Sequence, residues 1–261
     1  MDSDPLGRKL NLDNPDFHLS HGGAPVMDRI CQLLEQGEII VCDPLYRGSN
    51  HVFSVVLAKE GKVIRAIYKP RRGETPLYDF PDGTLYKREY AAYLTSQALE
   101  WFLVPPTVIR SGPYGIGSVQ WFVDARHRAN YGSQKAKYLS ELKRVALFDY
   151  LVNNADRKAS HCLEGRDGRL WMVDHGLTFN AMPKLRTVIW DFSGQSVPGK
   201  LVSDVSALQK KLKRAKPLRE ALSRVLAIVE VETLEYRLKK IIDNPVFPYP
   251  ESHWSMPWPW V

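Results

Sequence analysis

Two segments, NNADRK (residues 153–158) and VDHGLTF (residues 173–179), are the most informative part of this sequence. The first ends an apolar helical pattern, and the second begins where the apolar run LWMV (residues 170–173) ends. Their aspartates, Asp156 and Asp174, are 174 − 156 = 18 positions apart, which leaves room for a loop, a hairpin turn and a return strand. Two carboxylates can therefore face one metal-bound phosphate, so the spacing suggests phosphoryl transfer.

Either aspartate, taken alone, is better explained by a turn, because Asn and Asp are frequent turn residues and Asp-x-Gly is a common turn sequence. Two upstream residues change this interpretation. Lys69 closes a predicted strand, and Glu89 lies in the next predicted helix. A strand lysine paired with a helix glutamate is how kinase folds hold the α- and β-phosphates of ATP. A lysine, a glutamate and two aspartates thus occur in the order that a kinase requires.

The chain before residue 124 combines short strands with two helices. Apolar residues at helical spacing predict one helix over 24–37 and an amphipathic helix over 85–101. Runs of β-branched and apolar residues, separated by turn sequences, predict an antiparallel sheet. Its strands are expected at residues 38–42, 52–58, 63–68, 104–109 and 116–123, with an irregular loop over 70–84.

The chain after residue 124 is mainly helical. Apolar periodicity predicts helices over 137–152, 205–212 and 217–242, and the proline-rich end over 247–261 excludes a regular helix. The predicted fold class is therefore α+β, with two lobes: an antiparallel β-rich N-lobe and a mainly helical C-lobe. The expected division is an N-terminal arm over 1–25, an N-lobe over 26–123 and a C-lobe over 124–261 that carries both aspartate motifs.

Composition narrows the class of partner. A formal net charge of +7 favours anionic partners such as nucleotides or phospholipid surfaces, but no nucleic-acid-binding motif is present, so nucleic acid is not the expected partner. Three cysteines without a Cys-x-x-Cys pair argue against a disulfide framework and a zinc site. The N-terminus lacks a secretory signal, and no apolar run reaches the ~18 residues that span a bilayer. We therefore expect a cytoplasmic protein without a transmembrane segment.

A turn sequence, RGSN (residues 47–50), separates the first two predicted strands. Its backbone N–H groups, around Ser49 and Asn50, can cover the phosphates of a nucleotide. The sequence is neither a Walker A motif nor a full GxGxxG, and an ordinary hairpin turn explains it equally well.

At this point the motifs resemble a known family. AIYKP (residues 66–70), Glu89, NADR (residues 154–157) and DHGLTF (residues 174–179) are similar to motifs of the phosphatidylinositol 3-/4-kinase superfamily, and most similar to those of the type II phosphatidylinositol 4-kinases. DFPDGTL and KLRTVIW, at residues 79–85 and 184–190, also resemble an uncharacterised bacterial group of kinase-like proteins.

The resemblance implies an atypical protein or lipid kinase fold that uses ATP with Mg²⁺ or Mn²⁺. It implies that Asp156 is the catalytic aspartate, that Asp174 holds the metal, and that Lys69 binds phosphates while Glu89 pairs with it. It also implies that the adenine lies against a hinge at the end of the N-lobe, formed by Gln120, Trp121, Phe122 and Val123.

Three features depart from the family pattern. Five positions after the catalytic aspartate, where these lipid kinases have an asparagine as second metal ligand, this chain has His161. An imidazole there favours a softer ion such as Mn²⁺, unless only one metal is held and His161 is a structural hydrogen-bonding residue. The palmitoylated cysteine-rich segment of the type II enzymes is missing, and the loop over the phosphates is poorer in glycine. Lipid specificity is therefore the least transferable property.

Two surface features bear on membrane contact. The basic run at residues 210–216 can attract an acidic surface, and Trp254, Trp258 and Trp260 can sit at a lipid interface. A solvated helix face explains the first more simply, and docking of the tryptophans on the C-lobe explains the second.

Cys162, beside His161, is better explained as a buried apolar residue than as a nucleophile.

The expected function is ATP-dependent transfer of the γ-phosphate to a hydroxyl of an unidentified acceptor, which can be a lipid, a protein or a small molecule. Two alternatives remain. A pseudokinase would bind nucleotide and regulate a partner, as the substitution at His161 allows. A nucleotidyltransferase would bind ATP in the reverse orientation and deliver AMP, because the motifs do not determine orientation.

Overall fold

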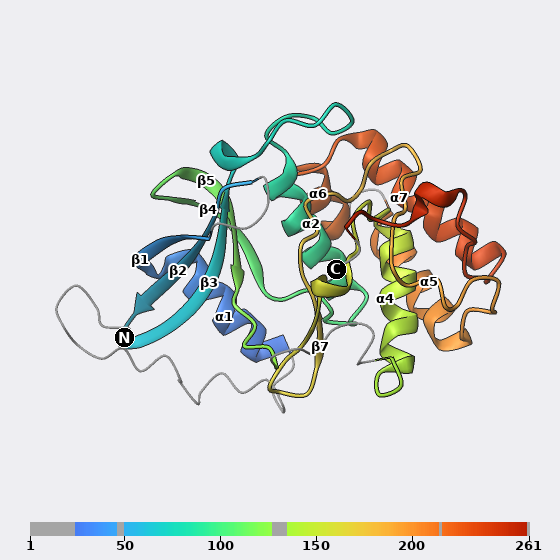
Figure 1. Ribbon diagram of the computed structural model, residues 1–261, viewed down its shortest axis with the longest axis horizontal. Coiled ribbons are helices and arrows are strands. Elements are labelled where there is room, and N and C mark those ends of the chain that lie inside the picture. The colour runs from blue at the N-terminus through green and yellow to red at the C-terminus, as the bar shows by residue number, and fades with distance from the viewer. Residues whose placement is uncertain (1–23, 46–49, 127–134, 214–215, 260–261) are drawn as a thin grey trace.

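The computed structural model describes residues 24–45, 50–126, 135–213 and 216–259. Strands and helices separate into two halves (Figure 1): the sheet with α1 lies on the left, α4, α5 and α7 lie on the right, and α2 lies between them. This is the predicted α+β class with a β-rich and a helical half. The predicted arm over 1–25 lies almost wholly outside the described residues.

The N-terminal half is built on a five-stranded antiparallel sheet in the order β1-β2-β3-β5-β4. Alternate residues of β3 point inward, among them Ile64, Ala66 and Tyr68, and helix α1 packs its apolar face against the sheet. The elements are α1 (Ala24–Gln36), β1 (Glu38–Leu45), β2 (Val52–Lys59), β3 (Lys62–Pro70), β4 (Thr107–Gly112) and β5 (Gly115–Trp121).

Helix α2 (Leu85–Ala98) is buried on more than one face, so the expectation of an amphipathic helix was wrong. Its side chains Arg88 and Glu89 are as buried as Ala91 and Ala92. The physical reason is position: α2 contacts strands β4 and β5 on one side and α6 of the helical half on another. Buried charges on such a helix require partners, and these partners belong to the site described below.

The helical half surrounds the largest apolar core of the protein. It consists of α4 (Leu139–Leu151), the two-stranded hairpin β6 (Cys162–Glu164) and β7 (Leu170–Met172), α5 (Gly199–Lys211), α6 (Pro217–Ser223) and α7 (Ile228–Asp243). The expected single helix over 217–242 is two helices. The chain turns at residues 224–227, and the Glu230 carboxylate accepts a hydrogen bond from the Ala227 N–H at 2.9 Å, which caps the second helix.

The C-terminal segment has no regular helix beyond a short 3₁₀ turn, η4 (His253–Ser255). Trp254 and Trp258 are 70% and 86% exposed, so the expectation that they dock on the C-lobe was wrong. Trp260 lies outside the described residues. No helix in the described part of the chain is both long and apolar enough to cross a bilayer.

Candidate active site

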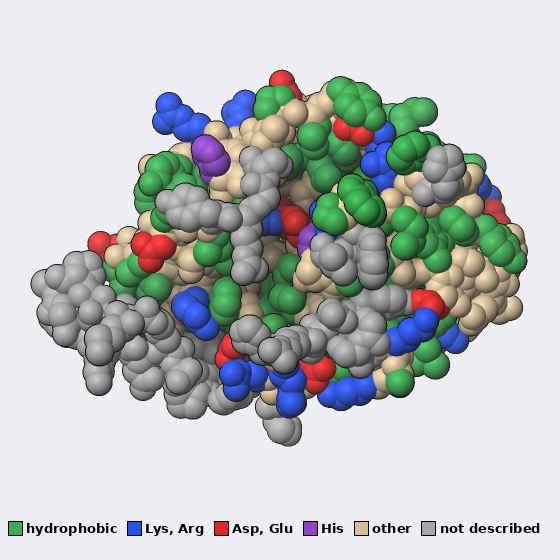
Figure 2. Space-filling model, viewed as in Figure 1, with side chains coloured by type: hydrophobic (Ala, Val, Ile, Leu, Met, Phe, Trp, Pro, Cys, Tyr) green, Lys and Arg blue, Asp and Glu red, His purple; other side chains and the backbone are tan. Residues whose placement is uncertain are grey.

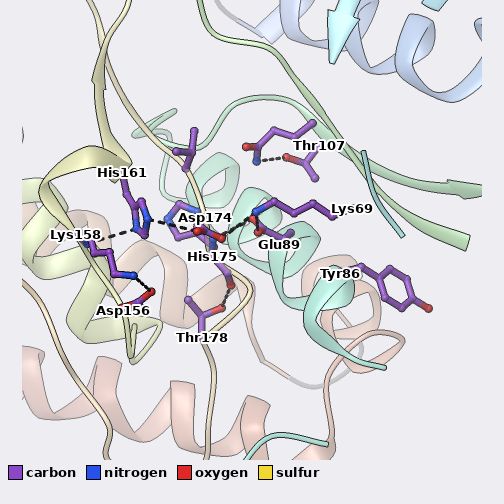
Figure 3. A network of polar contacts seen from close by, with 12 residues as sticks. Lys69, Tyr86, Glu89, Thr107, Asp156, Lys158, His161, Asp174, His175 and Thr178 are labelled. Atoms are coloured by element: carbon purple, nitrogen blue, oxygen red, sulfur yellow. Dashed lines mark hydrogen bonds and ion pairs between the residues drawn. The ribbon is translucent and has the colours of Figure 1, made fainter. Parts of the chain in front are cut away.

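Three charged side chains from distant parts of the chain meet at the junction of the two halves (Figure 3). Lys69, at the end of β3, forms an ion pair with Glu89 of α2, and its Nζ lies 2.9 Å from Oδ1 of Asp174, which follows β7. The second Glu89 oxygen accepts a hydrogen bond from the backbone N–H of His175 at 3.0 Å. Glu89 therefore holds both the lysine and the loop that carries Asp174.

The electrostatics keep this group charged. Burial by itself would lower the pKa of Lys69, but the Asp174 and Glu89 carboxylates outweigh it and raise this pKa above its ordinary range. Lys69 in turn holds the pKa of Asp174 well below the ordinary value of an aspartate. The Asp174 side chain is 51% exposed, so an ionised carboxylate faces the space between the two halves.

Asp156 lies on the opposite side of Asp174 from Lys69 (Figure 3). Its Oδ2 is 3.1 Å from Nζ of Lys158, and its backbone N–H donates to Oδ1 of Asn154 at 3.0 Å. Burial raises the pKa of Asp156 above its ordinary value, although Lys158 opposes this shift. A half-buried carboxylate with a raised pKa is a better proton acceptor than a fully solvated one.

Arg157, which follows Asp156, is completely buried and ties the two aspartate loops together. Its guanidinium binds both oxygens of Asp149 on α4, at 3.0 Å from Nε to Oδ2 and 3.1 Å from Nη2 to Oδ1. It also donates to the Val173 carbonyl at 2.8 Å and contacts His175 Nε2 at 2.7 Å. Burial and Arg157 hold the pKa of His175 well below its ordinary value, so this ring accepts the hydrogen bond as a neutral imidazole.

A second buried arginine, Arg88, fixes helix α2 against the loop that carries Asp174. Its Nη1 donates to the Thr178 carbonyl at 2.7 Å, and its Nη2 pairs with Glu230 of α7 at 2.6 Å. Because Arg88 is adjacent to Glu89, this pair holds the helix in the position that lets Glu89 reach Lys69. Neither the burial of Arg88 nor the pairing of Asp149 with Arg157 was predicted: Arg157 belongs to the NADR motif, but nothing in the sequence indicates its partner or separates Arg88 and Asp149 from surface charges.

His161 lies beside Asp174, with Nε2 at 3.4 Å from Oδ2. Its Nδ1 faces the backbone N–H of Lys158 at 3.4 Å, as an acceptor. Burial lowers the pKa of His161 to about 4, so the ring is neutral at pH 7 and its proton lies on Nε2, which faces Asp174. In this arrangement the Nε2–H group of His161 faces the Asp174 carboxylate, and metal ligation through Nε2 requires the other tautomer.

A cleft of about 930 Å³ contains these groups, and Figure 2 shows charged side chains at the bottom of the hollow between the two halves. One end of the cleft is lined by the predicted hinge residues Gln120, Trp121, Phe122 and Val123. The remaining predicted residues that line it are Asn50, Lys69, Glu89, Asp156, His161 and Asp174. Ser49 lies outside the described residues.

Hydrogen bonds within the protein occupy several of the polar groups that line the cleft. The Gln120 side chain is buried and donates to Thr107 Oγ1 at 2.8 Å, and its backbone lies in the interior strand β5, opposite Ile67 on one side and Thr107 on the other. The N–H groups of Trp121 and Phe122 donate to Pro106 and Arg65 carbonyls, at 2.8 and 3.0 Å. The Asn50 side chain accepts a hydrogen bond from the Thr75 N–H at 2.8 Å, which anchors this end of the β1–β2 connection over the cleft.

The donor set fits a hard cation. Mg²⁺ takes few protein ligands and completes its octahedron with water and substrate phosphate, and a single ionised carboxylate such as Asp174 meets that need. No cluster of three or more His, Cys, Asp or Glu side chains that could hold a metal occurs within the described ranges. Cys162 is buried, and burial raises the pKa of its thiol to about 12, as an unreactive core cysteine requires.

A sheet-bearing half and a helical half, with a lysine–glutamate pair and two loop aspartates at their junction, define a kinase-like fold. Solved structures agree. The Golgi casein kinase with Mn/ADP bound superposes with a TM-score of 0.53 at 16% identity, over 84% of this chain and 75% of that one. Hydra Fam20 with sugar gives 0.52 at 14% identity, over 85% and 88%. At such identities the likeness concerns the fold.

The family follows from the sequence comparison. The family model described as phosphatidylinositol 3- and 4-kinase matches residues 88–248, more than half of the chain, and the chain belongs to this family. A curated relative, Protein Rv2133c of Mycobacterium tuberculosis, is 37% identical over 262 residues, which is 87% of this chain and 94% of the relative. The predicted superfamily and the α+β kinase-like fold are thereby confirmed, and they support kinase-type phosphoryl transfer.

Proposed function

We propose that this chain is an ATP-dependent kinase that transfers the γ-phosphate to a hydroxyl of its acceptor. One observation carries the proposal: Lys69 bridges Glu89 and Asp174 in a cleft whose other wall carries Asp156. A scaffold that only binds a partner gains nothing from a desolvated lysine between two carboxylates, whereas phosphate binding requires a fixed cation there.

Each residue has a role that its surroundings support. Lys69, fixed by Glu89, neutralises the α- and β-phosphates. Asp174 would hold a divalent ion, which would supply neutralising charge to the phosphates. Asp156 accepts a hydrogen bond from the acceptor hydroxyl and orients it toward the γ-phosphate. Lys158, paired with Asp156 at 3.1 Å, adds positive charge where the transferred group carries negative charge.

The nucleotide base is assigned to the hinge end of the cleft. Phe122 and Val123 line this end of the cleft, and the Val123 N–H, which donates to none of the described residues, is assigned to the purine edge. Ile67 and Leu163 line the same space and provide an apolar sandwich for the ring. The proposal retains the predicted cytoplasmic location and leaves the acceptor class to experiment.

Replacement of Asp174 by alanine tests the metal role. Wild-type protein is expected to gain about 2.7 kcal/mol of stability at an ATP–Mg²⁺ concentration 100 times Kd. Asp174→Ala should lose this gain, because the phosphates then lack their shared cation. Thermal unfolding with and without nucleotide measures it. Asp124→Ala, an exposed carboxylate paired with Arg166, is the control that should keep the gain. An unchanged nucleotide effect in Asp174→Ala would refute the metal role.

A pseudokinase is the second candidate, and His161 is the observation that favours it. The neutral imidazole lies against Asp174, with Nε2 at 3.4 Å from Oδ2, where the family pattern has a metal-binding amide, so a second metal lacks its usual ligand. Single-turnover assays with ATP labelled at the γ-phosphate, in Mg²⁺ and in Mn²⁺, separate the two. We expect transfer or hydrolysis in at least one metal. Tight ATP binding with no turnover in either would favour the pseudokinase.

Nucleotidyl transfer is tested in the same assay with ATP labelled at the α-phosphate. The position of Lys69 in the cleft does not determine which phosphate reacts, because a nucleotide bound in the reverse orientation would meet the same lysine and carboxylates. We expect the label to stay in ADP. Label covalently bound to an acceptor as AMP would overturn the kinase proposal.

A further inference from the structure

A second cavity, of about 360 Å³, lies in the helical half, and it shares no lining residue with the nucleotide cleft. Its walls come from the end of α4, from residues 181–190, from α7 and from residues 248–255. The lining is mainly aromatic and apolar, with Tyr150, Trp190, Tyr236, Tyr249, Pro183 and Leu185. A volume of this size accommodates a small organic molecule.

The unusual member of this cavity is Arg237, on the inward face of α7. It is 8% exposed, and its Nε donates to the Leu151 carbonyl at 2.7 Å. Its Nη2 is buried without any hydrogen-bond partner in the described chain, and no ion pair of Arg237 occurs there. Burial lowers the pKa of Arg237 to about 10, which still leaves it charged at pH 7.

An unpaired buried guanidinium costs free energy unless an anion completes it. The other buried arginines of the described chain show the contrast: Arg88 is paired with Glu230, and Arg157 with Asp149. Among the described residues none forms an ion pair with Arg237, and the Glu230 carboxylate, which is bound to Arg88, acts on it only through longer-range charge. The planar fork of Arg237 fits the two oxygens of a carboxylate or a phosphate.

The other side chains that line the cavity also favour an anion on an apolar body. Tyr150, which is half-buried, has no hydrogen bond from its hydroxyl to a described residue, and Lys240 adds positive charge at the rim, where Glu251 provides the opposing carboxylate. Aromatic side chains favour a flat apolar body packed against their faces. An oxyanion on a flat apolar body satisfies both kinds of wall.

We propose that this cavity is a binding site for a small organic oxyanion, a carboxylate or a phosphate monoester, carried on a flat apolar or aromatic body. Arg237 binds the oxyanion and the aromatic walls hold the body.

The site lies behind the catalytic loop. Arg237 holds the Leu151 carbonyl in the last turn of α4, and Asn153, which lines the cavity, is two residues from Ala155 and three from Asp156. The Asn153 side chain donates to the Asn180 and Met182 carbonyls, at 2.8 and 2.7 Å. A ligand in the cavity therefore rests on the segments that carry both aspartate motifs, without entering the nucleotide cleft.

Isothermal titration of the full chain with four probes tests the proposal. The probes are 3-phenylpropionate, phenyl phosphate, inorganic phosphate and the neutral 3-phenylpropan-1-ol. We expect one or both aromatic oxyanions to bind at least tenfold more tightly than the neutral alcohol and than inorganic phosphate. The stronger of the two aromatic probes identifies the head group. Saturating ATP should leave this binding unchanged.

Two variants locate the binding. Arg237→Gln removes the charge and should weaken the aromatic oxyanion at least tenfold, whereas Arg224→Gln, an exposed arginine after α6, should not. If Arg237→Gln fails to fold, Thr233→Phe fills the cavity from α7 and leaves the guanidinium in place. Absence of binding to every probe, equal binding of the neutral alcohol, displacement by ATP, or unchanged affinity in the folded variants would each overturn the proposal.

Discussion

Asp156→Asn is expected to lower kcat by about 10²–10⁴, the range that a positioned general base contributes. An asparagine keeps the shape but cannot accept the proton of the acceptor hydroxyl. ATP binding should change little, because Asp156 contacts Lys158 and not the Lys69 group. Steady-state kinetics on an acceptor, or the intrinsic hydrolysis of ATP, measures the loss, and nucleotide-induced thermal stabilisation measures the binding.

The pH dependence adds a second readout for this variant. Because burial raises the pKa of Asp156, the acid limb of the wild-type kcat/KM profile should lie above the range of an ordinary aspartate, with activity rising as the carboxylate deprotonates. This limb should vanish in Asp156→Asn. The matched control is Asp28→Asn on the exposed face of α1. A variant that keeps wild-type kcat would remove Asp156 from the proposed mechanism.

Asp149→Ala is expected to destabilise the protein by about 3–5 kcal/mol, because it leaves the Arg157 guanidinium buried without its carboxylate. Both side chains are fully buried, so water cannot replace the missing partner. A loss of this size is a large fraction of the ~5–15 kcal/mol that stabilises a typical protein. Urea unfolding followed by circular dichroism measures it, provided that the m-value is unchanged.

The control for this prediction is an ion pair of the same type on the surface. Asp243→Ala breaks the pair of Asp243 with Lys239, both well exposed at the end of α7, and should cost only ~0–1 kcal/mol. Equal losses in the two variants would contradict the structural role of Asp149. Activity should fall together with stability in Asp149→Ala, since Arg157 also orders Val173 and His175 beside Asp174.

The pairing of Lys69 with Glu89 is the part of the site that sequence patterns predicted most directly. Each residue lies at a defined place in an element with a clear period, the end of a strand and the second turn of a helix. The order of four charged residues along the chain then matched one fold. That Asp174 lies on the same side of the protein as Asp156 was also predicted from the sequence, because the hairpin between the two aspartates is short and local.

The pairs Arg88–Glu230 and Asp149–Arg157 could not be predicted in this way. Arg88 and Glu230 are 142 positions apart, and an arginine on a helix is normally assigned to the surface. The apolar residues that recur on one face predicted that α2 is amphipathic, although packing against the sheet and the helical half buries it on several faces. The exposed Trp254 and Trp258 show the converse error, because apolar composition does not reveal whether a binding face is available.

Periodicity, turn chemistry and the spacing of charged motifs establish the α+β class, most of the element positions and the four charged residues that we propose to act on the phosphates, since these depend on short stretches of chain. The folded protein alone reveals which charges are buried together, that Nε2 of His161 faces Asp174, and that Arg237 lines an aromatic cavity with its Nη2 unpaired among the described residues. These properties arise from contacts between segments far apart in sequence, where burial and desolvation determine the energy of a charge.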